Sequence, residues 1–279
     1  MNLFSLQGRE CACFVPNGGI KGKLPVSVLC GWGMKDKMPG FAVELPPMLL
    51  FFAESEGNRD FTPWPSPGLR EEEFTGEAVG YLSFLTEAAL PFLEEKFGAT
   101  ADRDKRALLG YSLGGLFALW AAGQTEAFGR YASLSGSLWY EGFAGYLREM
   151  RLSNGTEFYL SLGDREEFGG PPLLRTVGER TREAVSILSG KGFAVTMEWK
   201  RGGCPVEEGS ALGRRKADPV WVSLKGKKWD KLVFPIPACF SCSCSFCPTC
   251  SGPAENRWVM IRREKIGCCF FWNAQAKYV

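Results

Sequence analysis

The sequence predicts an α/β fold, with a mostly parallel central sheet and helices on both of its faces. Strand-like and helix-like segments alternate from the start of the chain to about residue 200, as in sheets whose strands are joined by crossover helices. One strand-like run, Met48–Ala53, is apolar at every position, as expected of a strand that a parallel sheet buries on both faces. A chain of 279 residues is long enough for one large domain of this kind and a small appendage.

Short apolar runs that end at turn residues are expected to be the strands of this sheet. They are Cys11–Val15, Leu24–Cys30, Met48–Ala53, Arg106–Leu109, Tyr131–Leu134, Glu157–Leu162 and Phe193–Trp199. Apolar residues at helical spacing predict helices over Glu77–Phe97 and Leu173–Leu188, and a small-residue helix follows Gly115 to about Ala122. The Pro-rich segment Glu54–Glu73 is expected to be an ordered surface loop.

The alternation of strands and helices stops after Gly203. We expect residues 1–225 to form the α/β domain and residues 226–279 to form an irregular, basic, Cys-rich tail, either disordered or accidentally encoded. Three pairs have the two-residue gap that lets thiolates share Zn²⁺: Cys239 and Cys242, Cys244 and Cys247, and Cys247 and Cys250. A zinc ribbon needs a second such pair roughly 12–20 residues away, and it is missing, since Cys268 and Cys269 are adjacent. A zinc-binding module is therefore the weaker alternative, and neither a metal nor a cofactor is expected.

Composition and charge exclude several other classes of protein. The hydrophobic content of 45% argues against global disorder, and a net charge of +2 gives no reason to expect a nucleic-acid partner. No uncharged apolar run approaches the roughly 18–20 residues that cross a bilayer. Arg9 and Glu10 come too early for a secretory signal, so we expect a soluble, cytoplasmic protein. Nothing in the sequence indicates its oligomeric state.

The run Gly110-Tyr111-Ser112-Leu113-Gly114 fits the G-x-S-x-G pattern of a nucleophile elbow, between a predicted strand and a predicted helix. Such a turn is strained and crowded, so the positions two residues before and after the serine must lack bulk. It projects the hydroxyl of Ser112 above the sheet, and it places the backbone N–H of Leu113 to stabilise an oxyanion. A glycine-rich turn without chemistry is the plain alternative.

Two other turns could complete the site. A second oxyanion donor is expected after an earlier strand, where we favour the Trp32 N–H over a plain tight turn. The acid of a Ser-acid-His triad should follow a later strand, where Asp164, Glu166 and Glu167 stand together. The plain alternative for these carboxylates is a solvated, charged loop.

Four ordered motifs carry a resemblance to a known family: RDFTPWP, GYSLGGLFALW, ASLSGSLW and YLSLGDREE. Over about residues 8–203, the chain resembles bacterial α/β-hydrolases of the esterase D and enterobactin-esterase (IroE-like) group. The resemblance implies an α/β-hydrolase fold and the hydrolysis of small-molecule carboxylic esters by a serine. Its G-x-x-E pattern implies Glu166 as the acid, with Asp164 second. The residues that would line the substrate pocket are Asp60, Phe61, Trp64, Ser137 and Trp139.

The sequence contains no histidine. In the family that it resembles, the catalytic histidine follows the final strand, and here Cys204 stands at that place. Without a base, Ser112 would stay a protonated alcohol, and about 10³–10⁴-fold catalysis over water would remain. One explanation is natural loss of activity, which leaves a non-catalytic ligand-binding protein. The other is a shifted reading frame near residue 203, which the abrupt change of the tail favours.

Overall fold

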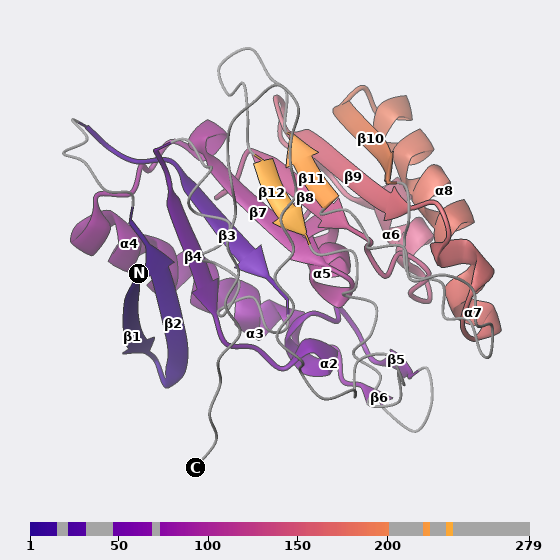
Figure 1. The fold of residues 1–279 in the computed structure, drawn as a ribbon, viewed down its shortest axis with the longest axis horizontal. Helices are drawn as coiled ribbons and strands as arrows, with labels where there is room; N and C mark the ends of the chain where they lie inside the picture. Colours follow the sequence, from indigo (N-terminus) through magenta and orange to yellow (C-terminus); the bar gives the residue numbers. More distant parts are fainter. Residues whose placement is uncertain (16–21, 32–46, 69–72, 201–219, 224–232, 237–279) are drawn as a thin grey trace, which may run out of the picture. The chain divides into compact units, whose positions relative to one another are not determined.

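A computed structural model describes residues 1–15, 22–31, 47–68 and 73–200, and the backbone of 220–223 and 233–236. Its main feature is an eight-stranded sheet in the order β1-β2-β4-β3-β7-β8-β9-β10 (Figure 1). The strands are β1 (Asn2–Leu6), β2 (Arg9–Phe14), β3 (Val26–Cys30), β4 (Leu49–Ala53), β7 (Arg106–Tyr111), β8 (Arg130–Leu134), β9 (Glu157–Gly163) and β10 (Ala194–Lys200). β1 and β2 pair antiparallel with their neighbours, and the other neighbouring pairs are parallel.

Helices and short strands connect these strands. They are α2 (Gly57–Asp60), β5 (Ser66–Pro67), β6 (Glu73–Phe74), α3 (Ala78–Ser83), η2 (Phe84–Ala89), α4 (Leu90–Phe97), η3 (Arg103–Lys105), α5 (Leu113–Ala121), α6 (Phe143–Glu149), η4 (Glu166–Phe168), α7 (Pro172–Arg175) and α8 (Val177–Gly190). Beyond residue 200, β11 (Val220–Ser223) pairs antiparallel with β12 (Val233–Ile236). The rest of the expected tail, with its cysteines, lies outside the described residues.

The expected fold, a mostly parallel sheet with helices, is confirmed. Each expected strand is present with ends shifted by a few residues, and the helices expected at 77–97, after Gly115 and at 173–188 are present. β1 and α6 were not expected. β1 is mostly exposed and lies at the edge of the sheet, so it has no continuous apolar run to reveal it.

The helix expected over 77–97 changes its winding in the middle. Residues Phe84–Ala89 form a π-helical segment, in which the N–H of Leu90 donates to the carbonyl of Leu85, five residues before it. The next residue is Pro91, which has no N–H and whose ring disfavours an ordinary α-helical turn before it. The wide turn lets the helix pass the proline without ending.

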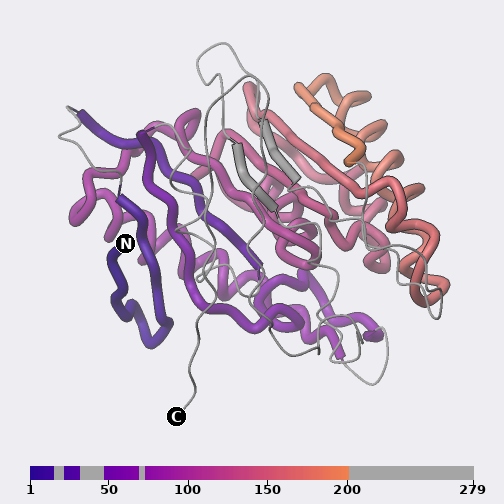
Figure 2. Tube along the Cα trace, in the orientation of Figure 1, coloured from indigo at the N-terminus to yellow at the C-terminus, as the bar shows by residue number. Residues whose placement is uncertain are grey.

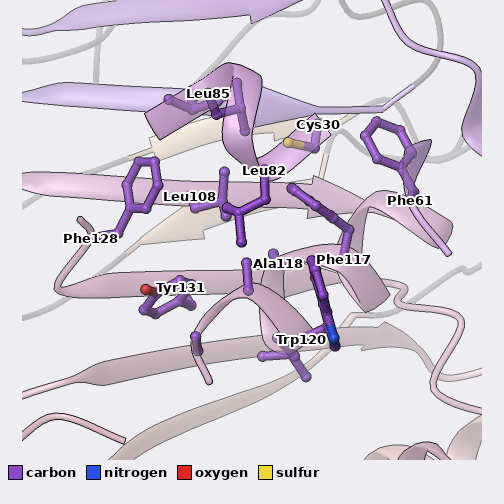
Figure 3. Close-up of a cluster of buried hydrophobic side chains, with 14 of the residues drawn as sticks. Cys30, Phe61, Leu82, Leu85, Leu108, Phe117, Ala118, Trp120, Phe128 and Tyr131 are labelled. Atoms are coloured by element: carbon purple, nitrogen blue, oxygen red, sulfur yellow. The ribbon is translucent and has the colours of Figure 1, made fainter. Parts of the chain in front are cut away.

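The hydrophobic core between the sheet and the helices uses one face of the sheet. In β3, the alternate residues Val26, Val28 and Cys30 belong to the core cluster, together with side chains of α3, α4, α5, α6 and α8. Figure 3 shows part of this cluster, including Cys30 of β3, Leu108 of β7 and Phe117 of α5. The long helices of the described ranges therefore all lie on one face. Helices on the second face, which the sequence also predicts, would fall outside the described residues.

Three aromatic rings form the centre of this core near the carboxyl ends of the strands. The ring centres of Phe61, Tyr81 and Phe117 are 5.4–5.6 Å apart, and each of these side chains is fully or almost fully buried. In the sheet, β3 and β7 pair directly although they are distant in the sequence (Figure 2). The rings therefore link the loop after β4 to the helix after β7.

We expect Phe117→Ala to destabilise the fold by about 3–5 kcal/mol, because it removes a fully buried ring and leaves a cavity among two other rings. The measurement is the free energy of unfolding in urea. The matched control is Phe168→Ala, since Phe168 is 73% exposed and its truncation should cost little. Equal losses for the two variants would contradict the described core.

Candidate active site

Ser112 lies in a strained turn between β7 and α5. Its φ of 56° and ψ of −119° fall in a region that residues with a side chain rarely adopt, at a cost of about 1–3 kcal/mol. The surrounding backbone holds this conformation: the Ser112 N–H donates to the Leu134 carbonyl over 3.1 Å, and the Gly115 N–H donates to the Ser112 carbonyl over 3.0 Å. The side chain is only partly buried, so its hydroxyl is within reach of a ligand.

Three glycines let the backbones meet at this turn. A Cβ on Gly110 would lie 1.9 Å from the carbonyl oxygen of Gly114, and a Cβ on Gly114 would lie 2.3 Å from the carbonyl oxygen of Cys30. A Cβ on Gly115 would lie 2.8 Å from Ser133 Oγ. The first two contacts are with backbone, which cannot move aside. The glycines of the G-x-S-x-G pattern are therefore needed for packing, as the sequence predicted.

The loop after β8 meets this turn. The Oγ atoms of Ser137 and Ser112 are 3.2 Å apart, and the Ser137 N–H donates to the Ser112 carbonyl over 3.0 Å. Ser137 is 3% exposed. The buried Ser137 hydroxyl therefore lies next to the Ser112 hydroxyl and can orient it by a hydrogen bond. α5 begins at the next residue, Leu113, so the positive end of its dipole points to the same place.

The same loop also holds a carboxyl group. Ser135 Oγ donates to Glu166 Oε1 over 2.7 Å, and the Gly163 N–H donates to the same oxygen over 2.8 Å. Burial raises the pKa of Glu166 above its usual value, although these two hydrogen bonds act in the opposite direction. Ser135 has a φ of 46°, so a second strained residue carries one of the groups that orient this site.

The site thus has a serine in a strained strand-to-helix turn, and the loop next to it holds a partly buried carboxyl. A protein-family model described as "Putative esterase" matches residues 42–188, more than half of the chain. The chain belongs to this esterase family.

Two curated relatives match part of this esterase-family chain. "Uncharacterized protein YbbA" of Bacillus subtilis is 33% identical over 154 residues, which are 53% of this chain and 62% of the relative. "Siderophore enterobactin esterase" of Emericella nidulans is 29% identical over 154 residues, which are 51% of this chain and 48% of the relative. The chain therefore spans about half to three fifths of the length of these relatives.

Solved structures share the fold of this esterase-family chain. An IroE-like serine hydrolase from Shewanella oneidensis superposes with a TM-score of 0.57 at 18% identity, over 68% of each chain. The enterobactin esterase FES from Shigella flexneri superposes with a TM-score of 0.54 at 18% identity, over 72% of this chain and 53% of that one. The expected family resemblance is thus confirmed for the family and for the α/β-hydrolase fold.

The two carboxylates considered for the acid have different surroundings. Asp164 is exposed, and its backbone N–H donates to the carbonyl of Lys200 at the end of β10 over 2.9 Å. Glu166 is mostly buried and held by two hydrogen bonds. The two hydrogen bonds fix the orientation of the Glu166 carboxyl, as a triad acid requires, and its role stays a prediction.

Two of the expected pocket residues have their side chains engaged elsewhere. Asp60 is 2% exposed and receives two hydrogen bonds from Arg9, at 2.7 and 3.2 Å. Burial alone would raise its pKa, but hydrogen bonds from Arg9, the Glu56 N–H and Arg59 outweigh burial and hold the pKa below its usual value. Phe61 lies among the core rings described above. A role of Asp60 and Phe61 in a substrate pocket stays a prediction.

The other expected pocket residues come together at the loop after β8. Trp64 Nε1 donates to the Glu141 carbonyl over 3.0 Å, and the Tyr140 hydroxyl donates to the Trp64 carbonyl. Trp139 is 8% exposed and lies next to Tyr140 in the same loop as Ser137. Loops that the sequence predicted to share a pocket are therefore in contact, and no sequence signal pointed to Tyr140 as the residue that joins them.

Some expected residues cannot be placed. Trp32, the expected second oxyanion donor, and Cys204, at the position of the missing histidine, both lie outside the described residues.

A hollow of about 530 Å³ lies away from Ser112, between the end of α5 and the start of β9. It is therefore at the opposite ends of the strands from Ser112. Among the described residues, no three His, Cys, Asp or Glu side chains form a group that could hold a metal ion. No described helix is long and apolar enough to cross a membrane.

We expect Ser112→Gly to be more stable than Ser112→Ala by about 1 kcal/mol. Glycine adopts the conformation at this turn without strain, whereas alanine keeps the Cβ that causes it. Part of the gain is lost because glycine also adds freedom to the unfolded chain. The measurement is the free energy of unfolding of both variants. An alanine variant at least as stable as the glycine variant would show that the turn is not strained.

We expect Glu166→Gln to raise stability at neutral pH and to have little effect in acid. A carboxyl whose pKa is higher in the folded chain favours folding below its unfolded pKa, and this contribution is lost as the pH rises through the folded pKa. Glutamine does not titrate and keeps an oxygen for both hydrogen bonds. The measurement is unfolding in urea from pH 4 to pH 8. A glutamine variant that is less stable at pH 8 than at pH 4, relative to the parent, would contradict the raised pKa.

Proposed function

We propose that this chain descends from serine hydrolases of carboxylic esters and that Ser112 is its nucleophile. The observation that carries the proposal is the strained turn that presents the Ser112 hydroxyl at the start of α5. A turn that costs free energy and is held by close backbone contacts is typical of functional sites. Membership of the esterase family supports the same chemistry.

In this proposal the neighbouring groups have distinct roles. The N–H of Leu113, the first residue of α5, stabilises the oxyanion that forms when Ser112 attacks an ester carbonyl. Trp32 supplies the second donor, by its place after β3. The carboxyl of Glu166 orients the base. The substrate is a small-molecule ester, as the name of the Emericella relative indicates for that protein.

The general base of this proposed mechanism is missing from the sequence. The sequence has no histidine, and Cys204 occupies the place where the family's histidine is expected. A neutral thiol is a poor proton acceptor, and a thiolate close to Glu166 is disfavoured by like charge. We therefore propose that hydrolysis is impaired. The same observation favours a second function, a non-catalytic protein that binds a small ligand on a hydrolase scaffold.

We expect Cys204→His to accelerate hydrolysis of a short-chain p-nitrophenyl ester by about 10²–10⁴-fold, the usual contribution of a positioned general base. The control Cys204→Ala removes the thiol without adding a base and should leave the rate unchanged. Adding Ser112→Ala to the histidine variant should abolish the gain. A fluorophosphonate that labels Ser112 only in the histidine variant would support the same assignment.

A histidine variant no faster than the alanine control, in a chain that keeps its fold by circular dichroism, would contradict the esterase proposal. The ligand-binding function would then be the better interpretation. Ligand binding at Ser112 can be tested separately, because a bound small ester raises the thermal unfolding temperature by an amount that grows with the ratio of its concentration to its Kd.

A further inference from the structure

Two adjacent carboxylates of the turn η4 are attached to different parts of the molecule. Glu166 Oε1 accepts hydrogen bonds from Ser135 and from the Gly163 N–H, at the candidate site. Both carboxylate oxygens of Glu167 lie 3.2 Å from Nη2 of Arg182, on α8. Glu166 therefore connects the turn to the candidate site, and Glu167 connects the same turn to α8.

The contact between Glu167 and α8 depends on a glycine in the first turn of that helix. A Cβ on Gly178 would lie 1.7 Å from Glu167 Oε2 and 3.3 Å from Glu167 Cβ. Gly178 has an ordinary helical backbone, so the helix itself does not require glycine here. The Glu167 carboxylate occupies the space that a Cβ at position 178 would need, so a side chain there would force this carboxylate away from the helix.

Arg182 extends this contact to the last strand of the sheet. Its guanidinium lies 4.8 Å from the ring centre of Trp199, which pairs with Leu162 of β9 near the end of β10. The Arg182 side chain is 55% exposed, so its ion pair with Glu167 contributes about 0–1 kcal/mol to stability. The three side chains connect η4, α8 and β10.

We propose that Glu167, seated against Gly178 and held by Arg182, is a positioning residue that sets the place of the Glu166 carboxyl in the active site. The inference rests on the proposed role of Glu166 as the triad acid. Glu166 and Glu167 share a peptide unit, so a shift in the backbone of one residue moves the other. A displacement of about 1 Å at a catalytic group costs on the order of 10²-fold in rate.

The charged groups around Glu166 are few among the described residues. Glu167 and Arg182 form an ion pair between η4 and α8, and Asp164 and Arg165 on the same loop are exposed. On β10, Lys200 lies beside that loop, since its carbonyl accepts the Asp164 N–H. The loop after β8 contributes the uncharged Ser135. The titration of Glu166 therefore reports mainly on its burial and on its two hydrogen bonds.

The test is Gly178→Ala, with Gly190→Ala as the matched control. Gly190 ends the same helix, and a Cβ there would meet nothing within 4 Å. Each variant is made in the parent chain and in the Glu166→Gln chain, and the free energy of unfolding is measured from pH 4 to pH 8. We expect Gly178→Ala to remove the pH-dependent difference in stability between the chain that keeps Glu166 and the chain that carries Glu166→Gln, because the displaced carboxyl becomes hydrated. Gly190→Ala should leave that difference unchanged.

A merely structural glycine would lower stability equally with either residue at position 166. A pH-dependent difference that persists in Gly178→Ala would therefore overturn the proposal. This readout does not need catalysis, so it decides the positioning role even if Cys204→His is inactive and the esterase proposal fails.

An active Cys204→His chain gives a second readout. There, Gly178→Ala should lower kcat on the p-nitrophenyl ester by about 10²-fold with little change in KM, because the substrate contacts are unaltered while the acid is displaced. Gly190→Ala should keep the full rate. Equal rates for the two alanine variants would overturn the proposal while leaving the esterase assignment intact.

Discussion

The close approach of α5 to the ends of β3 and β7 is the constraint on which the rest of the site depends. Two backbone carbonyls, those of Gly114 and Cys30, occupy the space that side chains at positions 110 and 114 would fill. The helix is therefore seated directly on the strands, and the single residue that joins β7 to α5 has no freedom to adopt an ordinary conformation. The strain at Ser112 follows from this packing.

Hydroxyl groups in one loop link the two halves of the site. The loop after β8 places Ser137 beside Ser112 and Ser135 beside Glu166, so one short segment contacts both the candidate nucleophile and the candidate acid. Both contacts are partly buried, and the residue that contacts Glu166, Ser135, has a strained backbone with a φ of 46°. The geometry of the site is thus set by the sheet and its loops, and it does not depend on the residue that supplies the base.

Much of the fold was predictable because its signals are local. Buried parallel strands are read from apolar runs, and the turn at Ser112 is read from glycines whose spacing has a steric cause. The acid was narrowed to Glu166 only through the family resemblance, since three carboxylates in one loop look alike in sequence. What separates them is contact with distant residues: Ser135 lies 31 residues from Glu166, and Arg182 lies 15 residues from Glu167. The ion pair of Asp60 with Arg9 was hidden for the same reason.

During synthesis, β7, β8, β9 and β10 emerge in the same order in which they lie in the sheet. Each new strand pairs with the strand before it, so the loops that close are short and the entropy lost in closing them is small. The backbone contacts that hold the turn at Ser112 come from Cys30, Leu134, Ser137 and the turn itself. All these partners precede β9 in the chain, so a change beyond residue 200 would remove none of the contacts that hold the turn.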